Sequence, residues 1–245
     1  MNRLKGFACI FLLIFASACQ RTNREIEPSV IEKPATEKVV AVQVDNIKGD
    51  FDYNQNGLDD YTDFVKGARE DAKNHPAYIP DYISENNGYP GPDQGVCTDV
   101  IWRAFREGGF SLRTMLNEDI KRRLEDYSNI KDGPNPNIDF RRVKTLRPFF
   151  EKYADKLEIE MTDPSQWQPG DIVIFSPRDF HIGLLSDRRN SQGYPYVFHN
   201  MGQKDREEDY LTKKKGEITG HYRFNASNIP PEILKPWVQG EDGRP

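Results

Sequence analysis

Hydrophobic and polar positions follow two different periods along this chain, and the change falls near residue 170. Before that point, apolar residues recur at helical spacing in four segments, at 61–73, 97–107, 112–127 and 143–154. After it come short apolar runs separated by turns, at 172–175, 181–186, 196–199 and 221–224, which is the pattern of strands. Helices followed by strands with short connections predict an α+β domain with an antiparallel sheet.

The N-terminus carries a targeting signal ahead of the folded part. In residues 1–18, Arg3 and Lys5 precede an apolar run that is too short to span a bilayer, which predicts a secretory signal peptide. Small residues stand directly before Cys19, as in a bacterial lipobox, although Ala16 occupies the usual leucine position. We therefore expect Cys19 to become a lipidated N-terminus. The alternative is ordinary signal-peptide cleavage at the same bond.

Polar sequence flanks the folded part on both sides. Residues 19–47 predict a disordered tether and residues 231–245 a loose tail, so we expect one domain at 48–230. The 245-residue chain has a formal net charge of -5, and no basic tract supports nucleic-acid binding. We expect a monomer in the bacterial cell envelope, either periplasmic or attached to a membrane through its lipid anchor alone.

Residues 52–63 have the polar spacing of a calcium-binding loop. Oxygen-bearing side chains occupy loop positions one, three, five and twelve, with a glycine at six and a backbone carbonyl at seven. The ligands would be Asp52, Asn54, Asn56, the carbonyl of Leu58, and Asp63. The loop resembles an EF-hand loop without its preceding helix, so calcium would be structural. The alternative is an Asx-rich turn that caps the following helix.

Cys97 is the cysteine that stays in the folded domain, because Cys9 leaves with the signal peptide and Cys19 lies in the tether. It opens a helical segment, where unpaired backbone N–H groups and the positive end of the helix dipole favour the thiolate. A lone thiol in an exported protein is a candidate reactive group. The alternative is a small buried hydrophobic residue.

The order of residues around Cys97 resembles a known enzyme family. Cysteine nucleophiles require an imidazole base and a polar group that orients it. Here Cys97 at a helix start is followed by Pro-Gly-Asp and an apolar strand at 169–175, then His181-Ile-Gly, then His199 at the end of a third strand. This order resembles the NlpC-type peptidoglycan cysteine peptidases, a compact papain-like family. The departure is Val96, where that family has aspartate.

A closer resemblance is to a bacterial family of the same superfamily, domain of unknown function family 1287. Its Gly-Val-Cys-Thr-Asp-Val, Asn-Ile-Asp-x-Arg-Arg-Val and His-Asn motifs match residues 95–100, 137–143 and 199–200. The resemblance implies a papain-like α+β fold. In that fold the nucleophile stands at a helix start, and the N-terminal helices pack on a small antiparallel sheet.

The resemblance also assigns roles to four residues. Cys97 would be the nucleophile, His181 the base and His199 the group that orients the base, with Asn200 behind it. Successive residues of a strand point to opposite faces, so His199 and Asn200 should not both reach His181 if the strand stays regular. The family pattern favours His199. The backbone N–H of Cys97 is the natural oxyanion donor at a helix start.

Four further residues are candidates for substrate binding. Tyr82 or Tyr89 would line the pocket as the family's upstream tyrosine does, with plain packing as the alternative. Arg141 and Arg142 would hold a substrate carboxylate, with a solvated or salt-bridged arginine pair as the alternative.

These features together predict an exported cysteine amidohydrolase or peptidase that cleaves an amide bond through a thioester at Cys97. The envelope location and the family resemblance both indicate cell-wall peptide as the substrate, with no cofactor required for catalysis. Two alternatives stay open. One is a papain-like module that binds cell-wall peptide without turnover, and the other is a cysteine hydrolase or acyltransferase that acts on another acyl substrate.

Overall fold

A six-stranded antiparallel sheet forms the centre of the computed structural model, which describes residues 41–175 and 180–244. In spatial order its strands are β3 (Ala154–Lys156), β8 (Ile218–Phe224), β4 (Ile172–Phe175), β5 (His181–Arg189), β6 (Pro195–Phe198) and β7 (Glu207–Glu208). Two short parallel strands, β1 (Ala77–Tyr78) and β2 (Gln94–Gly95), precede the cysteine helix.

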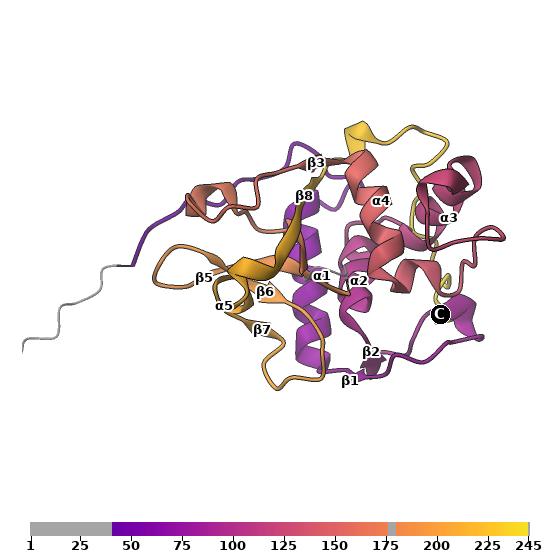
Figure 1. Cartoon of the computed structure of the whole chain (residues 1–245), viewed down its shortest axis with the longest axis horizontal. Helices are drawn as coiled ribbons and strands as arrows, with labels where there is room; N and C mark the ends of the chain where they lie inside the picture. The colour runs from indigo at the N-terminus through magenta and orange to yellow at the C-terminus, as the bar shows by residue number, and fades with distance from the viewer. Residues whose placement is uncertain (1–40, 176–179, 245) are drawn as a thin grey trace, which may run out of the picture. The chain divides into compact units, whose positions relative to one another are not determined.

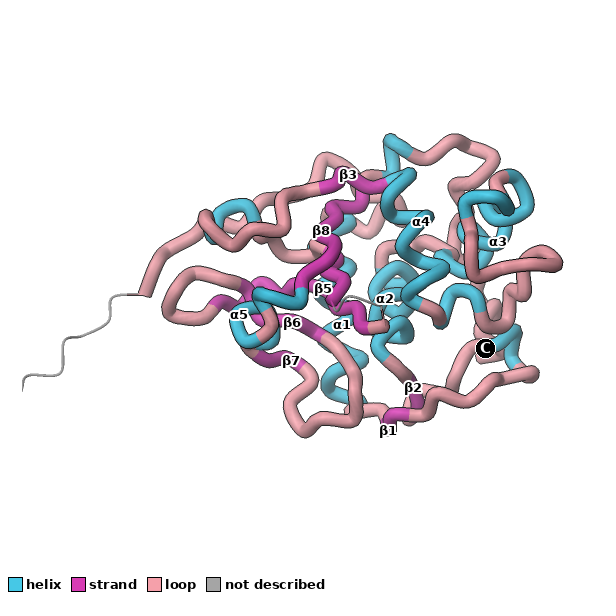
Figure 2. The backbone as a smooth tube through the Cα atoms, viewed as in Figure 1, coloured by secondary structure: helices cyan, strands magenta, loops and turns pink. Residues whose placement is uncertain are grey.

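Four helices pack together with one face of this sheet (Figures 1 and 2). They are α1 (Asp60–Asn74), α2 (Cys97–Glu107), α3 (Leu112–Arg122) and α4 (Val143–Tyr153), while a single turn, α5 (Tyr210–Lys213), follows β7. In Figure 1, α2, α3 and α4 lie to the right of β8 and α5 lies to its left. Short 3₁₀ turns complete the connections: η1 (Asn86–Gly88), η2 (Leu124–Asp126), η3 (Asp139–Arg141), η4 (Pro164–Gln166), η5 (Lys215–Glu217) and η6 (Ala226–Asn228).

Strand β4 shows why the sheet is apolar on both faces. Ile172 and Ile174 point into the large core that the four helices share, whereas Val173 and Phe175 point into a second core with Leu211 of α5. Successive strand residues face opposite sides of a sheet, and here both sides are covered. The uninterrupted apolar run of β4 therefore follows from its position between two cores.

The α+β class and the antiparallel sheet predicted from the sequence are confirmed. One predicted helix is shorter than expected: residues 112–127 were expected to be continuous, but α3 ends at Arg122. Tyr127 is buried and donates its hydroxyl to Asp119 of α3. Residues eight apart on a helix are separated by about 12 Å along its axis, so the chain must leave the helix for this contact to form.

The C-terminal segment differs from the loose tail expected at 231–245. Ile233 is buried in the large core, and the N–H of Trp237 donates to the carbonyl of Gly109 at 2.7 Å. Glu241 accepts the hydroxyl of Tyr89 at 2.6 Å. These contacts hold the segment against α2 and α3. The burial of its apolar side chains stabilises this position, and the polar composition of the segment does not reveal that burial.

Residues 1–18 and Cys19 lie outside the described part of the chain, so the signal peptide and the lipid anchor stay predictions. The end of the expected tether does make contacts: the N–H of Ile47 donates to Gln168 at 3.0 Å, and the N–H of Val42 donates to the carbonyl of Ser191 at 3.1 Å. Within residues 41–175 and 180–244, no helix is long and apolar enough to cross a membrane.

Candidate active site

Cys97 is the first residue of α2, and Asp99 fixes the start of that helix. Val96 precedes the helix in extended conformation, with φ -127° and ψ -176°. The Asp99 carboxylate accepts the N–H of Val96 and the indole N–H of Trp102, both at 2.7 Å. A side chain at the third helical position thereby reaches back to the residue before the helix, as in a capping box.

The backbone on both sides of His181 surrounds the Cys97 sulfur. Sγ lies 4.0 Å from the carbonyl oxygen of Phe180 and accepts the N–H of Ile182. Burial raises the pKa of the Cys97 thiol to about 11; the N–H of Ile182 opposes this rise and Asp99 adds to it. Burial therefore outweighs the helix start, which alone favours the thiolate, and the resting side chain is a thiol.

His181 and His199 face one another from β5 and β6. The register pairs Leu184 with Phe198, which places His199 beside Gly183 and on the same side of the sheet as His181. Nε2 of His181 lies 3.1 Å from Nδ1 of His199. A Cβ on Gly183 would meet the neighbouring strand at 2.4 Å, so glycine permits this close approach.

Burial also sets the protonation of the two imidazoles. It lowers the pKa of both His181 and His199 to about 3, so both rings are neutral at pH 7. Because Nε2 of His181 faces His199, Nδ1 is the ring nitrogen left to accept a proton. A neutral imidazole that reaches a neutral thiol can act as a general base at the moment of attack, without a preformed ion pair.

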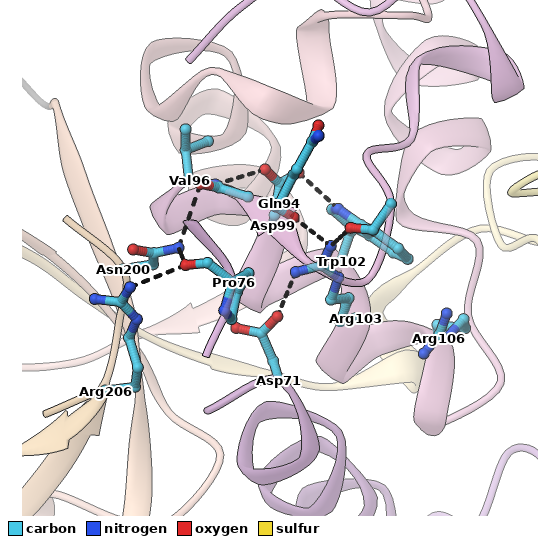
Figure 3. A network of polar contacts seen from close by, with 12 residues as sticks. Asp71, Pro76, Gln94, Val96, Asp99, Trp102, Arg103, Arg106, Asn200 and Arg206 are labelled. Atoms are coloured by element: carbon cyan, nitrogen blue, oxygen red, sulfur yellow. Dashed lines mark hydrogen bonds and ion pairs between the residues drawn. The ribbon is translucent and has the colours of Figure 1, made fainter. Parts of the chain in front are cut away.

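Asn200 contacts the segment before Cys97 rather than His181. Its amide nitrogen donates to the carbonyls of Pro76 and Gly95, each at 3.2 Å (Figure 3). Its carbonyl oxygen accepts the N–H of Gly202 at 3.0 Å. Asn200 is fully buried and therefore ties the end of β6 to the approach of α2.

Arg103 extends the same network from within α2 (Figure 3). Its guanidinium forms a buried ion pair with Asp71 of α1 and donates to the carbonyls of Gly91 and Gln94 at 2.8 and 2.7 Å. The turn that precedes Cys97 is thus held by side chains from α1, α2 and the sheet.

Arg141 makes the salt bridge that the sequence allowed as an alternative to substrate binding. Its side chain is 1% exposed and contacts both carboxylate oxygens of Asp99, at 3.0 to 3.2 Å. Its remaining N–H groups donate to the carbonyls of Asp81 and Ile79. Arg141 therefore supports the residue that fixes the start of α2. Arg142 differs, because its side chain is 51% exposed and its contact with Asp139 is long, at 3.9 Å.

A pocket of about 420 Å³ opens beside Cys97. Its wall is apolar apart from two arginines, one lysine and one asparagine. The lining residues are Tyr78, Pro80, Val96, Cys97, Asn129, Ile138, Arg141, Arg142, Val143, Lys144 and Phe180. The pocket thus combines the candidate nucleophile with cationic groups at the start of α4.

Neither tyrosine proposed from the sequence lines this pocket. Tyr82 is 55% exposed, and Tyr89 is 1% exposed because it packs against the edges of Trp102 and Trp237. Tyr89 therefore has the plain packing role that the sequence allowed as the alternative to lining the pocket. Tyr78 of β1 lines the pocket instead, since the pairing of β1 with β2 brings it beside the turn before Cys97.

The expected calcium loop at 52–63 has the geometry of an Asx-rich turn. Asp52 accepts the N–H groups of Asn56 and Gly57 at 3.0 and 2.8 Å. The side-chain amides of Asn54 and Asn56 donate to Asp63 at 2.9 Å. The N–H of Leu58 donates to the side-chain oxygen of Asn56 at 2.8 Å. These hydrogen bonds do not involve the carbonyl of Leu58, which the calcium loop would use as a ligand. Within the described residues, no cluster of three or more His, Cys, Asp or Glu side chains is arranged to hold a metal.

Two residues near the histidines had no signal in the sequence. The ring of Tyr210 packs on both imidazoles, with centroid distances of 5.2 Å to His181 and 4.2 Å to His199. Glu208 places Oε1 at 3.4 Å from Nε2 of His199. Both lie in a charged segment without regular periodicity, so only the tertiary fold brings them to the site. Asp99 did carry a signal, because an acidic residue at the third helical position is typical of a capping box.

The fold and the site define an α+β protein with a buried cysteine at a helix start and two facing histidines on adjacent strands. The chain belongs to the family described as Domain of unknown function (DUF1287), whose family model matches residues 65–224. It is 36% identical over 167 residues to the "Uncharacterized protein YijF" of Escherichia coli (strain K12), an alignment that covers 64% of this chain and 78% of that relative. No solved structure matches it.

Proposed function

We propose that the protein is a papain-like cysteine amidohydrolase of the cell envelope that cleaves an amide bond in cell-wall peptide. The observation that carries this proposal is the relation between Cys97 and His181. The sulfur lies against the backbone on both sides of His181, and Nε2 of that imidazole lies 3.1 Å from Nδ1 of His199. This arrangement supplies candidates for the nucleophile, the base and the orienting group that acyl transfer through cysteine requires.

The proposed reaction has two halves that share one base. Sγ of Cys97 attacks the amide carbonyl while Nδ1 of His181 takes the thiol proton. The tetrahedral oxyanion faces the N–H of Cys97 at the helix start. Collapse breaks the C–N bond, and His181 returns the proton to the departing amine, which leaves a thioester. Water then attacks the thioester, His181 takes a proton from it, and the acid product and the thiol are released.

The pocket supports a peptide substrate with acidic groups. Arg142 and Lys144 stand at the start of α4 and line the pocket, and the exposed guanidinium of Arg142 is free to meet a carboxylate bidentately. Asn129 also lines the pocket, and its buried side-chain oxygen has no hydrogen-bond partner within the described residues, so a modest side-chain rotation would let it accept a substrate N–H. Cell-wall peptide stems provide both groups.

Digestion of purified cell wall tests this proposal. We expect the wild-type protein to release peptides whose new termini are identified by mass spectrometry, and Cys97→Ala to release none while it keeps the wild-type melting temperature. A protein that binds cell wall without releasing peptide would favour the binding module. Turnover of another acyl substrate, with the cell wall left intact, would favour the second alternative.

A further inference from the structure

The histidine pair continues into two charged residues that lead to the protein surface. Glu208 of β7 places Oε1 at 3.4 Å from Nε2 of His199, and its other oxygen accepts Nζ of Lys213 at 2.6 Å. The exposed fractions of these side chains rise from 1% at His199 through 22% at Glu208 to 59% at Lys213. The contacts thus form a row from the buried base to solvent.

The sheet itself brings Glu208 to this position. The pairing of β6 with β7 places Glu208 opposite Val197, and His199 follows two residues later on the same side of the sheet. Lys213 comes from the last turn of α5, whose Tyr210 covers the imidazole of His199. The carboxylate is therefore held between the His199 ring and Lys213, the last residue of α5.

Neutral His199 carries one ring proton, and its position decides whether His181 can be a base. With the proton on Nε2, Nδ1 of His199 accepts the Nε2–H of His181, and Nδ1 of His181 is free to take a proton. With the proton on Nδ1, His199 donates to His181, which must then carry its own proton on Nδ1 and cannot accept another. The two arrangements differ only in which ring atoms hold hydrogen.

The groups around His199 favour the first arrangement. An ionised carboxylate is an acceptor only, so Glu208 stabilises a proton on the Nε2 that faces it. The amide nitrogen of Gln203 lies at nearly equal distances from Nδ1 and Nε2, 3.3 and 3.4 Å, and donates to the carbonyl of His199 itself at 2.8 Å, so Gln203 does not distinguish the two arrangements. Burial, aided by the positive charges of Arg206 and Lys213, lowers the pKa of His199 and keeps the ring neutral.

We propose that Glu208 is a positioning residue that holds His199, and through it His181, in the tautomer with Nδ1 of His181 free to accept the Cys97 proton. Lys213 orients the carboxylate by binding the oxygen that does not face His199. The catalytic consequence rests on the proposed hydrolase function, but the tautomer of the two imidazoles is a property of the free protein.

Glu208→Gln provides a specific test because Lys213 can only donate. The ammonium group of Lys213 should bind the side-chain oxygen of the glutamine at position 208 and turn the amide nitrogen of that glutamine toward Nε2 of His199. That nitrogen is a donor, so the proton of His199 should move to Nδ1 and the base should be blocked. In Glu208→Gln/Lys213→Met the amide is free to rotate, and the original tautomer should return.

The tautomers are read by ¹⁵N chemical shifts of the histidine rings, which require no substrate. We expect Nε2–H on both rings in wild type, Nδ1–H on both in Glu208→Gln, and Nε2–H again in the double variant. In the cell-wall assay, kcat should fall by at least about tenfold in Glu208→Gln with KM unchanged, and should recover in the double variant.

Glu118→Gln is the matched control, because Glu118 pairs with Lys121 at 2.8 Å at similar exposure, on α3. It should change neither the ring shifts nor kcat. Should Glu208→Gln not fold, Glu208→Ala replaces it and should give a mixture of tautomers.

Unchanged ring shifts in Glu208→Gln, or no recovery in the double variant, would overturn the role of Glu208. If the wild-type protein hydrolyses nothing, the shifts still decide this inference, and only the proposed function fails. If the wild type is active and the shifts do not respond to Glu208→Gln, the proposed function stands and this inference fails.

Discussion

Arg141→Met separates a structural role from a substrate-binding role at the pocket. The variant removes the partner of Asp99, whose side chain is fully buried beneath the start of α2. Loss of one partner from a buried ion pair leaves an uncompensated charge and costs about 3–5 kcal/mol. For a domain of this size that corresponds to a fall in melting temperature of about 6–20 °C.

Arg142→Met is the matched control, because it changes the neighbouring arginine in the same pocket. The Arg142 side chain is 51% exposed and its ion pair is long, so its loss should change stability by no more than about 0.5 kcal/mol. We expect Arg142→Met to raise KM for an acidic peptide and to leave the melting temperature unchanged.

The assay is thermal unfolding by circular dichroism, followed by kinetics on cell-wall peptide well below the melting temperature. Similar melting temperatures for both variants, with KM raised only by Arg141→Met, would refute the structural role of Arg141. That result would return Arg141 to the substrate-binding role that its sequence motif also allowed.

Three further predictions concern the thiol, the anchor and the loop. Because burial raises the pKa of Cys97 to about 11, the rate of its alkylation by iodoacetamide should rise about tenfold per pH unit from pH 7 to pH 10; a rate that levels off below pH 8 would indicate a preformed thiolate–imidazolium pair. Cys19→Ala should move the exported protein from the membrane fraction to the soluble fraction, because acyl chains are the strong apolar anchor that the sequence predicts; a soluble wild type would favour ordinary cleavage. If calcium binds at 52–63, it should raise the melting temperature of the wild type and not of Asp52→Ala; an equal response of both proteins, or none, would leave the Asx-rich turn.

The main elements of the fold could be predicted because periodicity reports burial. The runs at 172–175 and 181–186 are strands whose alternate residues face two cores, and the segments at 61–73 and 143–154 are helices with one buried face. Short elements without a period were missed. They include β7, which consists of two glutamates and is held by pairing with β6, and the single turn α5, which is held by packing of Tyr210 on the histidines.

The candidate site was predictable where backbone geometry decides it. Strand alternation predicted that His199 and Asn200 would not both reach His181, and the family pattern favoured His199. In the structure His199 faces His181, and Asn200 binds the turn before Cys97. The ionisation of Cys97 was not predictable, because a helix start favours the thiolate whereas the burial that opposes it is a tertiary property.

The sequence also could not predict which of the two adjacent arginines forms a buried ion pair. Arg141 and Arg142 are adjacent and chemically identical, yet one lies buried on Asp99 and the other reaches solvent. The difference comes from the 3₁₀ turn η3, which ends at Arg141 and directs the two side chains differently.

Trapping of the acyl-enzyme tests directly whether Cys97 is the nucleophile. The protein is mixed with cell-wall peptide, quenched in acid within the first turnover, and analysed by intact-mass spectrometry and peptide mapping. We expect a mass increase equal to the acyl half of the substrate, located on Cys97 in the wild type and absent from Cys97→Ala. Peptide release by Cys97→Ala at the wild-type rate, with no adduct on Cys97 in the wild type, would contradict that role.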